Sequence, residues 1–225
     1  KPLKGAWRSA TPVTTAMINL GPFPEPLHAA LAAGGDVVYI GMSGGISGTA
    51  HAAAMAVQEL QEEFPERKIA AIDTYAASLG EGLLVIEAAR MLENGAPFSL
   101  IVEQISRRRH TMCQYFTVDD LAYLERGGRV SKAAAIVGTV LKIKPLLRGD
   151  DEGKIVLCGK TRGRKPSLTA LADFYEKLVP DKSEELGIAH AADAAGAQPL
   201  LDAPPPRGLP APPSLFILRL NAPYK

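Results

Sequence analysis

The chain has 225 residues, of which 47% are apolar and 22% are charged, and its formal net charge is +1. This composition is typical of a globular protein and excludes a chain that is disordered throughout. The near-zero net charge argues against a protein whose whole surface binds nucleic acid. The two cysteines, Cys113 and Cys158, are too few for a disulfide scaffold, and the four histidines show no metal-ligand spacing. We therefore expect neither a metal site nor another cofactor.

The sequence shows no targeting signal for a membrane or for secretion. No uninterrupted apolar run reaches membrane-spanning length, and no signal peptide opens the chain. We therefore expect a cytoplasmic protein. Because the first residue is Lys1 and not Met, we also expect the chain to start inside a longer gene product.

The first half of the chain alternates short apolar runs with longer stretches of helical pattern. After an irregular, Pro-rich opening segment at 1–31, strands are predicted at 36–41 and 68–73, because both runs are short and apolar. The helices predicted in this half span 50–64, 78–94 and 99–109. The repeated strand–loop–helix order predicts a parallel sheet covered by helices.

The pattern changes near Phe116. Thr117, with Asp120 three residues later, is typical of an N-capped helix start, and a helix at 118–126 is predicted to end before two glycines. A second helix is predicted at 131–141. The remaining predicted elements are a hairpin at 144–158 that turns at 149–153, a helix at 165–178 and a strand that begins at Gly187.

Together these elements predict an α/β fold with two lobes and a tail. The first lobe, 1–115, is a parallel sheet with flanking helices, and the second, 116–195, is a smaller α+β lobe. The tail at 196–225 holds eight of the 18 prolines. Proline at that density excludes helix and interior strand and favours a linker.

A loop rich in glycine and serine, Gly41–Thr49, lies where the first strand hands over to a helix. In an open parallel sheet, ligands bind beyond the carboxyl ends of the strands, and a helix N-terminus offers N–H groups and a partial positive charge. Ser43, Ser47 and Thr49 add hydroxyl donors, so the loop suits a carboxylate or a phosphate. It lacks the Gly-Lys-Ser/Thr ending of a P-loop and the spacing of a dinucleotide-binding loop. An ordinary turn of small residues is an equal alternative.

A second strand-to-helix loop lies at 73–82. Here a capped helix start, with Ser78 or Thr74 as the cap, is the favoured interpretation. The three arginines Arg107–Arg109 end a helix, where positive charge is favourable, and are interpreted as structural. No nucleophile, base and acid can be assigned from spacing, so no catalytic residue is predicted.

The stretch Arg126–Lys165 is strongly basic, with eleven Lys or Arg residues against three acids, Asp150, Asp151 and Glu152. Such an excess favours contact with phosphate, nucleic acid or an acidic partner. Aromatic side chains do not interleave with these basic residues, which argues against a platform for single-stranded nucleic acid. A solvated hairpin surface is an equal alternative.

Five segments resemble the DegV family and follow one another in the family's order. They are Ile40–Thr49, Ile72–Gly82, Leu124–Lys132, Lys142–Arg148 and Gly159–Lys165. The family consists of bacterial fatty-acid-binding proteins, and some members are the lipid-carrying subunit of a fatty-acid kinase that serves phospholipid synthesis. The resemblance therefore implies a DegV-like fold and a carrier that is not itself an enzyme. Such a carrier holds a long-chain fatty acid between its two lobes while a separate kinase subunit phosphorylates the carboxylate.

The resemblance also implies which residues bind. The residues that match the family's carboxylate-binding positions are Ser9, Thr11, Ser43, Gly44 and Ser47. Ser9 takes the place of the family's headgroup threonine, and Gly44 stands where the family often has a second serine.

A partner subunit follows from the same resemblance. The basic face on which the kinase subunit would dock consists of Arg126, Arg129, Arg162, Arg164 and Lys165. Their charge would steer an acidic surface, or the triphosphate that it carries, toward the lipid. Nucleic acid is not an expected partner, and lipid exchange is compatible with peripheral contact with a membrane.

Two segments of the family pattern have no counterpart here. The opening strand with its Asp-Ser-Thr-like turn is missing before Lys1, and the Pro-rich tail stands in place of a closing Gly-Thr-His-x-Gly-Pro-Gly segment. A piece without both would leave sheet edges and the lipid tunnel partly open, so impaired lipid binding is one alternative. The others are an α/β enzyme that binds a phosphorylated metabolite at the two loops, and nucleic-acid binding through the basic stretch.

Overall fold

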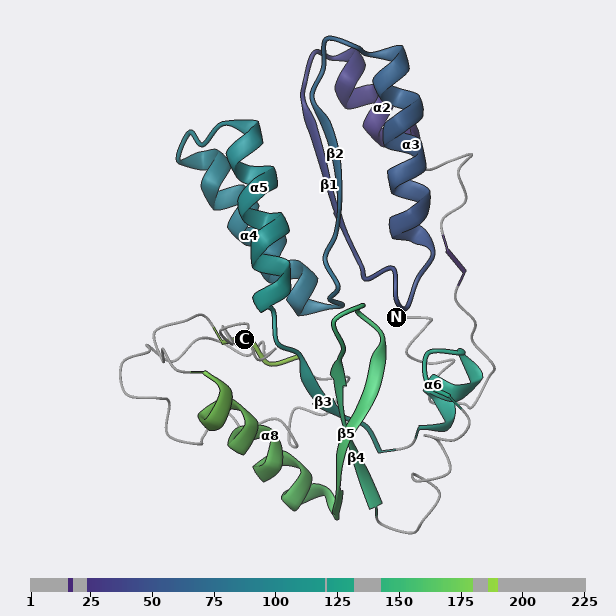
Figure 1. Cartoon of the computed structure of the whole chain (residues 1–225), viewed down its shortest axis with the longest axis vertical. Coiled ribbons are helices and arrows are strands. Elements are labelled where there is room, and N and C mark those ends of the chain that lie inside the picture. The colour runs from purple at the N-terminus through teal and green to yellow at the C-terminus, as the bar shows by residue number, and fades with distance from the viewer. Residues whose placement is uncertain (1–15, 18–23, 120, 132–142, 180–185, 190–225) are drawn as a thin grey trace, which may run out of the picture.

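A computed structural model describes residues 16–17, 24–119, 121–131, 143–179 and 186–189 (Figure 1). Several sequence predictions fall outside these residues: Ser9, Thr11, most of the helix at 131–141 and the tail at 196–225. The described residues form one parallel and one antiparallel sheet, each with helices packed against it. The α/β class predicted from the sequence is confirmed.

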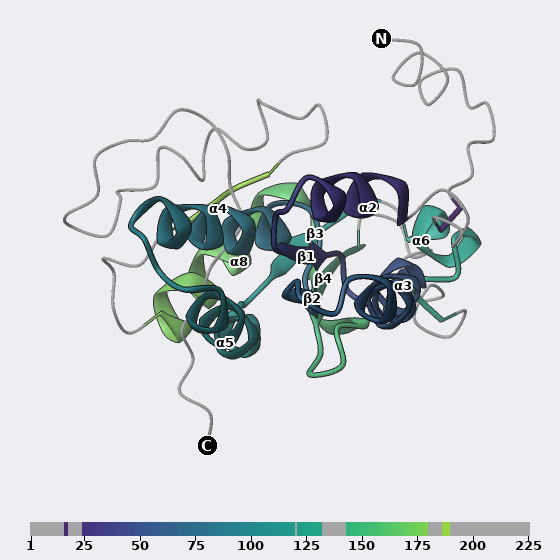
Figure 2. The same cartoon turned by 90° about the horizontal axis from the view of Figure 1, so that it is seen from above.

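The parallel sheet consists of β1, Val37–Gly41, and β2, Ile69–Asp73, paired in register along their full length. Helix α3, Thr49–Glu63, packs on one side of this pair (Figures 1 and 2). Helices α4, Leu79–Glu93, and α5, Phe98–Arg108, pack on the other. The ends of all five elements lie within one residue of their predicted positions.

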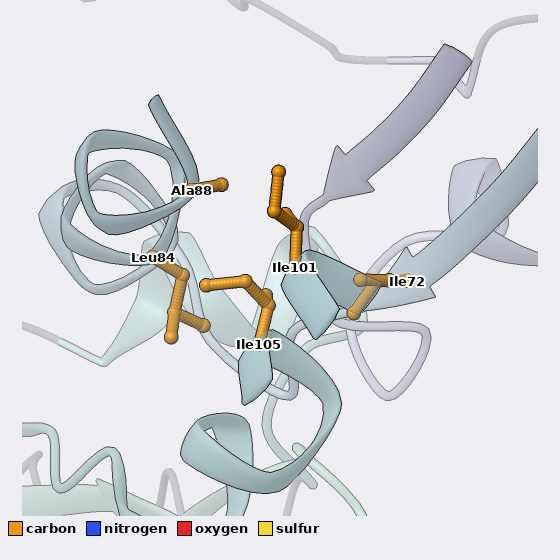
Figure 3. Packing of buried hydrophobic residues seen from close by; sticks show 5 residues of the cluster. All are labelled: Ile72, Leu84, Ala88, Ile101 and Ile105. Atoms are coloured by element: carbon orange, nitrogen blue, oxygen red, sulfur yellow. The ribbon is translucent and has the colours of Figure 1, made fainter. Parts of the chain in front are cut away.

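One core lies between the sheet and the pair α4–α5. Ile72 of β2 clusters with Leu84 and Ala88 of α4 and with Ile101 and Ile105 of α5, and the five side chains point toward one another from three elements (Figure 3). Leu84 and Ile105 are fully buried. The apolar residues of each helix are four positions apart, so they share the face that meets the sheet.

A second core lies on the α3 side of the sheet. Ala53 and Ala56 are fully buried against Tyr39 of β1. Tyr39 points to this side while its neighbours Val38 and Ile40 pack toward α4 and α5. This alternation is the period of a strand that is covered on both faces.

The end of the segment predicted as irregular at 1–31 is helical instead. Helix α2, Pro24–Ala32, packs against α3 and contributes Leu27 to the second core. A proline at the first helical position has the φ that a helix needs and lacks an N–H that would have no partner there. The proline therefore favours this helix start.

The second half of the chain contains an antiparallel sheet in the order β3, Tyr115–Thr117, β4, Ile143–Gly149, and β5, Ile155–Arg162. Helix α8, Arg164–Leu178, packs against all three strands. The predicted hairpin and the helix after it are confirmed. From Gly187 onward, the described residues contain an isolated bridge at Ile188 and no longer strand.

The helix predicted at 118–126 begins later than expected, and Thr117 does not cap it. Thr117 is the last residue of β3, and its hydroxyl donates to a carbonyl of β4 at 2.8 Å. The helix, α6, spans Ala122–Arg126. Phe116 packs into the buried cluster around Leu147, so burial keeps the chain extended where the local pattern favours a cap.

Leu84→Ala should destabilise the chain far more than Leu92→Ala on the same helix. Leu84 is fully buried, whereas Leu92 is 66% exposed. Emptying a buried leucine site costs about 2–5 kcal/mol, whereas a surface substitution changes stability by about 0.5 kcal/mol or less. Urea unfolding followed by circular dichroism measures both. Equal unfolding free energies for the two variants would contradict the core in Figure 3.

Candidate functional site

Three segments that lie far apart in the sequence meet at one edge of the parallel sheet. The first loop, 42–48, follows β1, and the second loop, 74–78, follows β2; the two strands are parallel, so both loops leave the same edge. The third segment is the hairpin turn, 150–154, between β4 and β5. Figure 1 shows the tip of this hairpin below the ends of β1 and β2. Hydrogen bonds join all three segments.

Ser43 of the first loop is the residue that connects them. It is 1% exposed. Its hydroxyl donates to the carbonyl of Gly153 in the hairpin turn at 2.8 Å and accepts from the N–H of Gly45 at 3.1 Å. Its own N–H donates to the carbonyl of Ala76 in the second loop at 2.8 Å. Ser43 therefore holds both other segments against the first loop.

The first loop also binds a carboxylate. Asp73, the last residue of β2, accepts from the N–H of Gly44 on Oδ2 and from the N–H of Tyr75 on Oδ1, both at 3.0 Å. This contact requires glycine, because a Cβ on Gly44 would lie 2.6 Å from Oδ2. An N–H donor to an ionised oxygen makes one of the stronger hydrogen bonds in proteins. The N–H of Gly44 is thus bonded to a carboxylate of the chain itself.

The rest of the first loop leads into α3. The hydroxyl of Ser47 donates to Oγ1 of Thr49 at 3.0 Å and accepts from the N–H of Thr49 at 3.3 Å. Arg129 reaches the loop from beyond α6, and its Nε donates to the carbonyl of Ile46 at 3.1 Å. Because α3 begins at Thr49, the loop lies at the positive end of that helix, where an anion is stabilised.

The second loop has a strained backbone. Tyr75 and Ser78 have φ of 52° and 56°, in the left-handed region that favours glycine. Ser78 occupies the position before α4 without making a capping bond, and the hydroxyl of Thr74 donates instead to the carbonyl of Gly41 at 2.7 Å. The capping role predicted for these two residues is therefore wrong. Each such backbone conformation costs on the order of 1–3 kcal/mol, so other parts of the chain must hold the loop.

Gln114 and Arg109 hold the second loop from outside. Oε1 of Gln114 accepts from the N–H of Ala77 at 3.0 Å, and its Nε2 donates to the carbonyl of the same residue at 2.7 Å. Nη1 of Arg109 donates to the carbonyl of Asp73 at 2.9 Å, and its guanidinium lies 4.5 Å from the ring centre of Tyr75. Arg109 thus has a structural role, as the sequence indicates.

Acidic groups gather behind the two loops. Burial raises the pKa of Glu81 although this residue lies in the first turn of α4, where the helix dipole favours the charged form. Burial also raises the pKa of Tyr39, and the charges of Glu81 and Asp73 raise it further. A further anion at this edge therefore needs hydrogen-bond donors to offset the charge already there.

The structure divides the five predicted docking residues into two groups. Arg126 ends α6, and Arg129, just after it, contacts the first loop. Arg162, Arg164 and Lys165 lie where β5 passes into α8, at the end of the hairpin opposite its turn (Figure 1). Along β5 the two ends are about 23 Å apart. Arg129 therefore lies with the first loop, whereas Arg162, Arg164 and Lys165 lie at the end of the hairpin far from its turn.

The sequence predictions about metal sites and membrane-spanning segments can be compared with the described residues. Within the described ranges, no three His, Cys, Asp or Glu side chains are grouped so that they could hold a metal ion. No helix in the same part of the chain has the length and apolar character needed to cross a membrane.

Sequence reasoning does not single out Gly153 or Gln114. Gly153 lies in a predicted turn, and its φ of 72° explains the glycine, but no local pattern indicates a bond to Ser43. Gln114 follows a helix and precedes a strand that the sequence does not predict. Both contacts depend on tertiary structure, and a single sequence carries no signal for them.

Gln114→Ala should loosen the second loop. The N–H and carbonyl of Ala77 would lose their partners, which costs about 1–3 kcal/mol. We expect a lower unfolding free energy in urea and faster amide exchange in the second loop. Gln58→Ala, on an exposed position of α3, is the matched control and should leave both unchanged. Identical exchange in the two variants would contradict the role given to Gln114.

Comparison with known proteins agrees with this architecture. A DegV domain-containing protein of Clostridium perfringens is 36% identical over 190 residues, which cover 84% of this chain and 65% of that protein. The structure of a fatty acid binding DegV family protein from Streptococcus agalactiae is 32% identical, with a TM-score of 0.74 over 84% of this chain and 66% of that one. The Fatty Acid Kinase (Fak) B3 protein of Streptococcus pneumoniae, loaded with linoleic acid, shares the fold at 22% identity, with a TM-score of 0.78 over 89% of this chain and 70% of that one.

The match covers most of this chain but less of its relatives. The chain spans 59% and 65% of the length of two curated relatives. The family model described as "Uncharacterised protein, DegV family" matches residues 6–204. The resemblance seen in the five sequence segments is confirmed, and the chain belongs to the DegV family.

Proposed function

We propose that the chain binds a long-chain fatty acid and holds its carboxylate at the first loop. The observation that carries the proposal is the bond from the N–H of Gly44 to the carboxylate of Asp73, because this loop thereby binds a carboxylate oxygen within the chain. The fatty acid binding relative from Streptococcus agalactiae supports the same ligand class. The proposed ligands of the carboxylate are Ser9, Thr11, Ser43, Gly44 and Ser47. Gly44 can donate to the lipid only when its N–H leaves Asp73, and Ser47 only when its hydroxyl leaves Thr49.

The chemistry of the first loop favours a carboxylate over a phosphate. The loop offers hydroxyl and N–H donors at the start of α3, where the helix dipole stabilises negative charge. The carboxylate of Asp73 already lies against Gly44, so a phosphate dianion would meet more repulsion than a singly charged carboxylate. A phosphorylated metabolite is therefore the weaker candidate.

The acyl chain belongs, in this proposal, between the lobes 1–115 and 116–195. The first loop lies in one lobe and the hairpin turn in the other, and the two are in contact. Ligand sites favour such junctions between parts of a fold. The chain is then a lipid carrier and not an enzyme, it works in the cytoplasm, and it contacts membranes peripherally when lipid is exchanged.

Ser43→Ala should bind fatty acid about fivefold more weakly, because lipid binding exchanges the bond from this hydroxyl to a neutral carbonyl for a stronger bond to a charged carboxylate, and alanine loses that difference. Mass spectrometry of lipid extracted from the purified protein identifies the ligand, and titration with a fluorescent fatty acid measures affinity. Ser99→Ala, at an exposed position of α5, is the control and should bind normally. Unchanged affinity in the double variant Ser9→Ala, Ser43→Ala would overturn the carboxylate assignment.

We also propose a kinase subunit as the partner, on the basis of the family motifs in the sequence. Arg162, Arg164 and Lys165 are the better docking group of the two, because they lie together at one junction and Arg162 and Lys165 are exposed. Arg129 is unsuitable for a test of docking, because its bond to Ile46 supports the first loop. The planar guanidinium of arginine suits phosphate or carboxylate on the partner.

The double variant Arg162→Glu, Lys165→Glu should slow phosphorylation of the bound lipid by a fatty-acid kinase subunit and ATP. We expect about a tenfold loss at low salt and a smaller one at high salt, with lipid affinity unchanged, because screening weakens steering between charged surfaces. Lys177→Glu, at the other end of α8, is the control for a charge reversal on the same helix, and it should leave the rate unchanged. A normal phosphorylation rate for the double variant at every salt concentration would contradict docking at Arg162, Arg164 and Lys165.

A further inference from the structure

The hydroxyl of Ser43 has a single proton, which it donates in a hydrogen bond to the hairpin turn. The carbonyl oxygen of Gly153 can only accept, so Ser43 is the donor in the 2.8 Å bond between them. The oxygen of the same hydroxyl accepts from the N–H of Gly45. An ionised carboxylate also only accepts. Gly153 and a fatty-acid carboxylate therefore compete for this proton.

The hairpin turn rests directly on both loops. Gly153 has φ of +72°, and a Cβ there would collide with the hydroxyl of Ser43 and lie 2.9 Å from Cα of Tyr75. A Cβ on Gly45 would lie 2.6 Å from the carbonyl carbon of Gly153. Glycine on each side thus permits backbone to meet backbone, and the contact leaves no space for a ligand carboxylate between Ser43 and the turn.

The hairpin turn also carries most of the negative charge in this part of the sequence. Asp150, Asp151 and Glu152 outnumber the single Lys154, which pairs with Glu152. Oδ1 of Asp150 accepts from the N–H groups of Glu152 at 3.0 Å and Lys154 at 2.8 Å. These bonds make the turn a unit that keeps its own shape. While it rests on the first loop, it opposes an approaching carboxylate through like charge.

We propose that the hairpin turn is a lid over the fatty-acid site, and that the carbonyl of Gly153 competes with the lipid carboxylate for the proton of Ser43. The lid lifts from Ser43 before the carboxylate accepts from it, so the resting lid and the bound carboxylate exclude each other. This inference rests on the proposed function. Opening the lid costs part of the free energy of lipid binding, so the apparent affinity for the lipid is lower.

Hydrogen–deuterium exchange of the unaltered protein tests the direction of the movement. Adding oleate should speed amide exchange in the hairpin turn, 150–154, and slow it in the first loop. Slower exchange in the turn on adding oleate would overturn the lid, because the turn would then close on the lipid.

Gly153→Ala tests the competition itself. Its side chain pushes the turn off Ser43, so a fluorescent fatty acid should associate about fivefold faster than with the unaltered protein, the equivalent of one ordinary hydrogen bond. Gly95→Ala is the matched control: Gly95 has a similar φ of +77° with nothing within 4 Å of an added Cβ. Equal association rates in the two variants would contradict the competition.

If Gly153→Ala does not fold, amide exchange of Ser43→Ala without lipid tests the same bond. Losing the bond to Gly153 should speed exchange in the hairpin turn, and unchanged exchange would overturn the lid.

Failure of the lid and failure of the proposed function give different results. No binding by the unaltered protein contradicts the proposed function and the competition with it, whereas binding with the turn protected contradicts the lid alone.

Discussion

The buried bond from Ser43 to Gly153 joins residues 110 positions apart, and the arrangement of the sheet edge depends on it. Parallel strands deliver the first and second loops to the same edge, and an antiparallel hairpin projects its turn against them. The other polar groups of Ser43 near this bond also have partners. Its N–H donates to the carbonyl of Ala76, and its hydroxyl oxygen accepts from the N–H of Gly45. Since a buried polar group without a partner costs about 1–3 kcal/mol, separating the turn from the loop requires a substitute acceptor.

The two sides of the site differ in how firmly they are held. The second loop keeps two residues at positive φ. Gln114 holds it through two hydrogen bonds to Ala77, and Arg109 donates a third bond to Asp73, just before the loop. The hydroxyl of Ser43 ties the hairpin turn to the first loop, and the bonds of Asp150 lie within the turn. This asymmetry makes the turn the part that moves and the sheet edge the part that stays. A carboxylate is the natural substitute acceptor, because it satisfies the hydroxyl that the turn releases.

Much of the fold is predictable from periodicity, whereas the contacts that build the site are not. The short apolar runs at β1 and β2 and the long helical patterns at α3 and α4 each follow from local sequence. Local signals fail where burial decides, as at Thr117, which continues a strand to keep Phe116 packed. The helix at 24–32 is a different case, because proline at its first position is a local signal for a helix start that the prediction of an irregular segment overlooks.

The candidate site shows the same limit. The first loop is predictable as a candidate loop for a carboxylate or a phosphate, because its glycines and hydroxyls stand between a strand and a helix. Its contact with Asp73 and Gly153 is not, since those residues are 29 and 110 positions from their partners. The basic residues are predictable as charge, but the contact of Arg129 with the first loop and the place of Arg162 at the far end of the hairpin depend on tertiary structure.

A crystal structure of the protein with bound oleate tests the central claim most directly. The account predicts a carboxylate oxygen about 3 Å from Oγ of Ser43, at ordinary hydrogen-bond distance, with the carbonyl of Gly153 moved out of reach of that hydroxyl. A carboxylate bound elsewhere, with the bond from Ser43 to Gly153 intact, would contradict it.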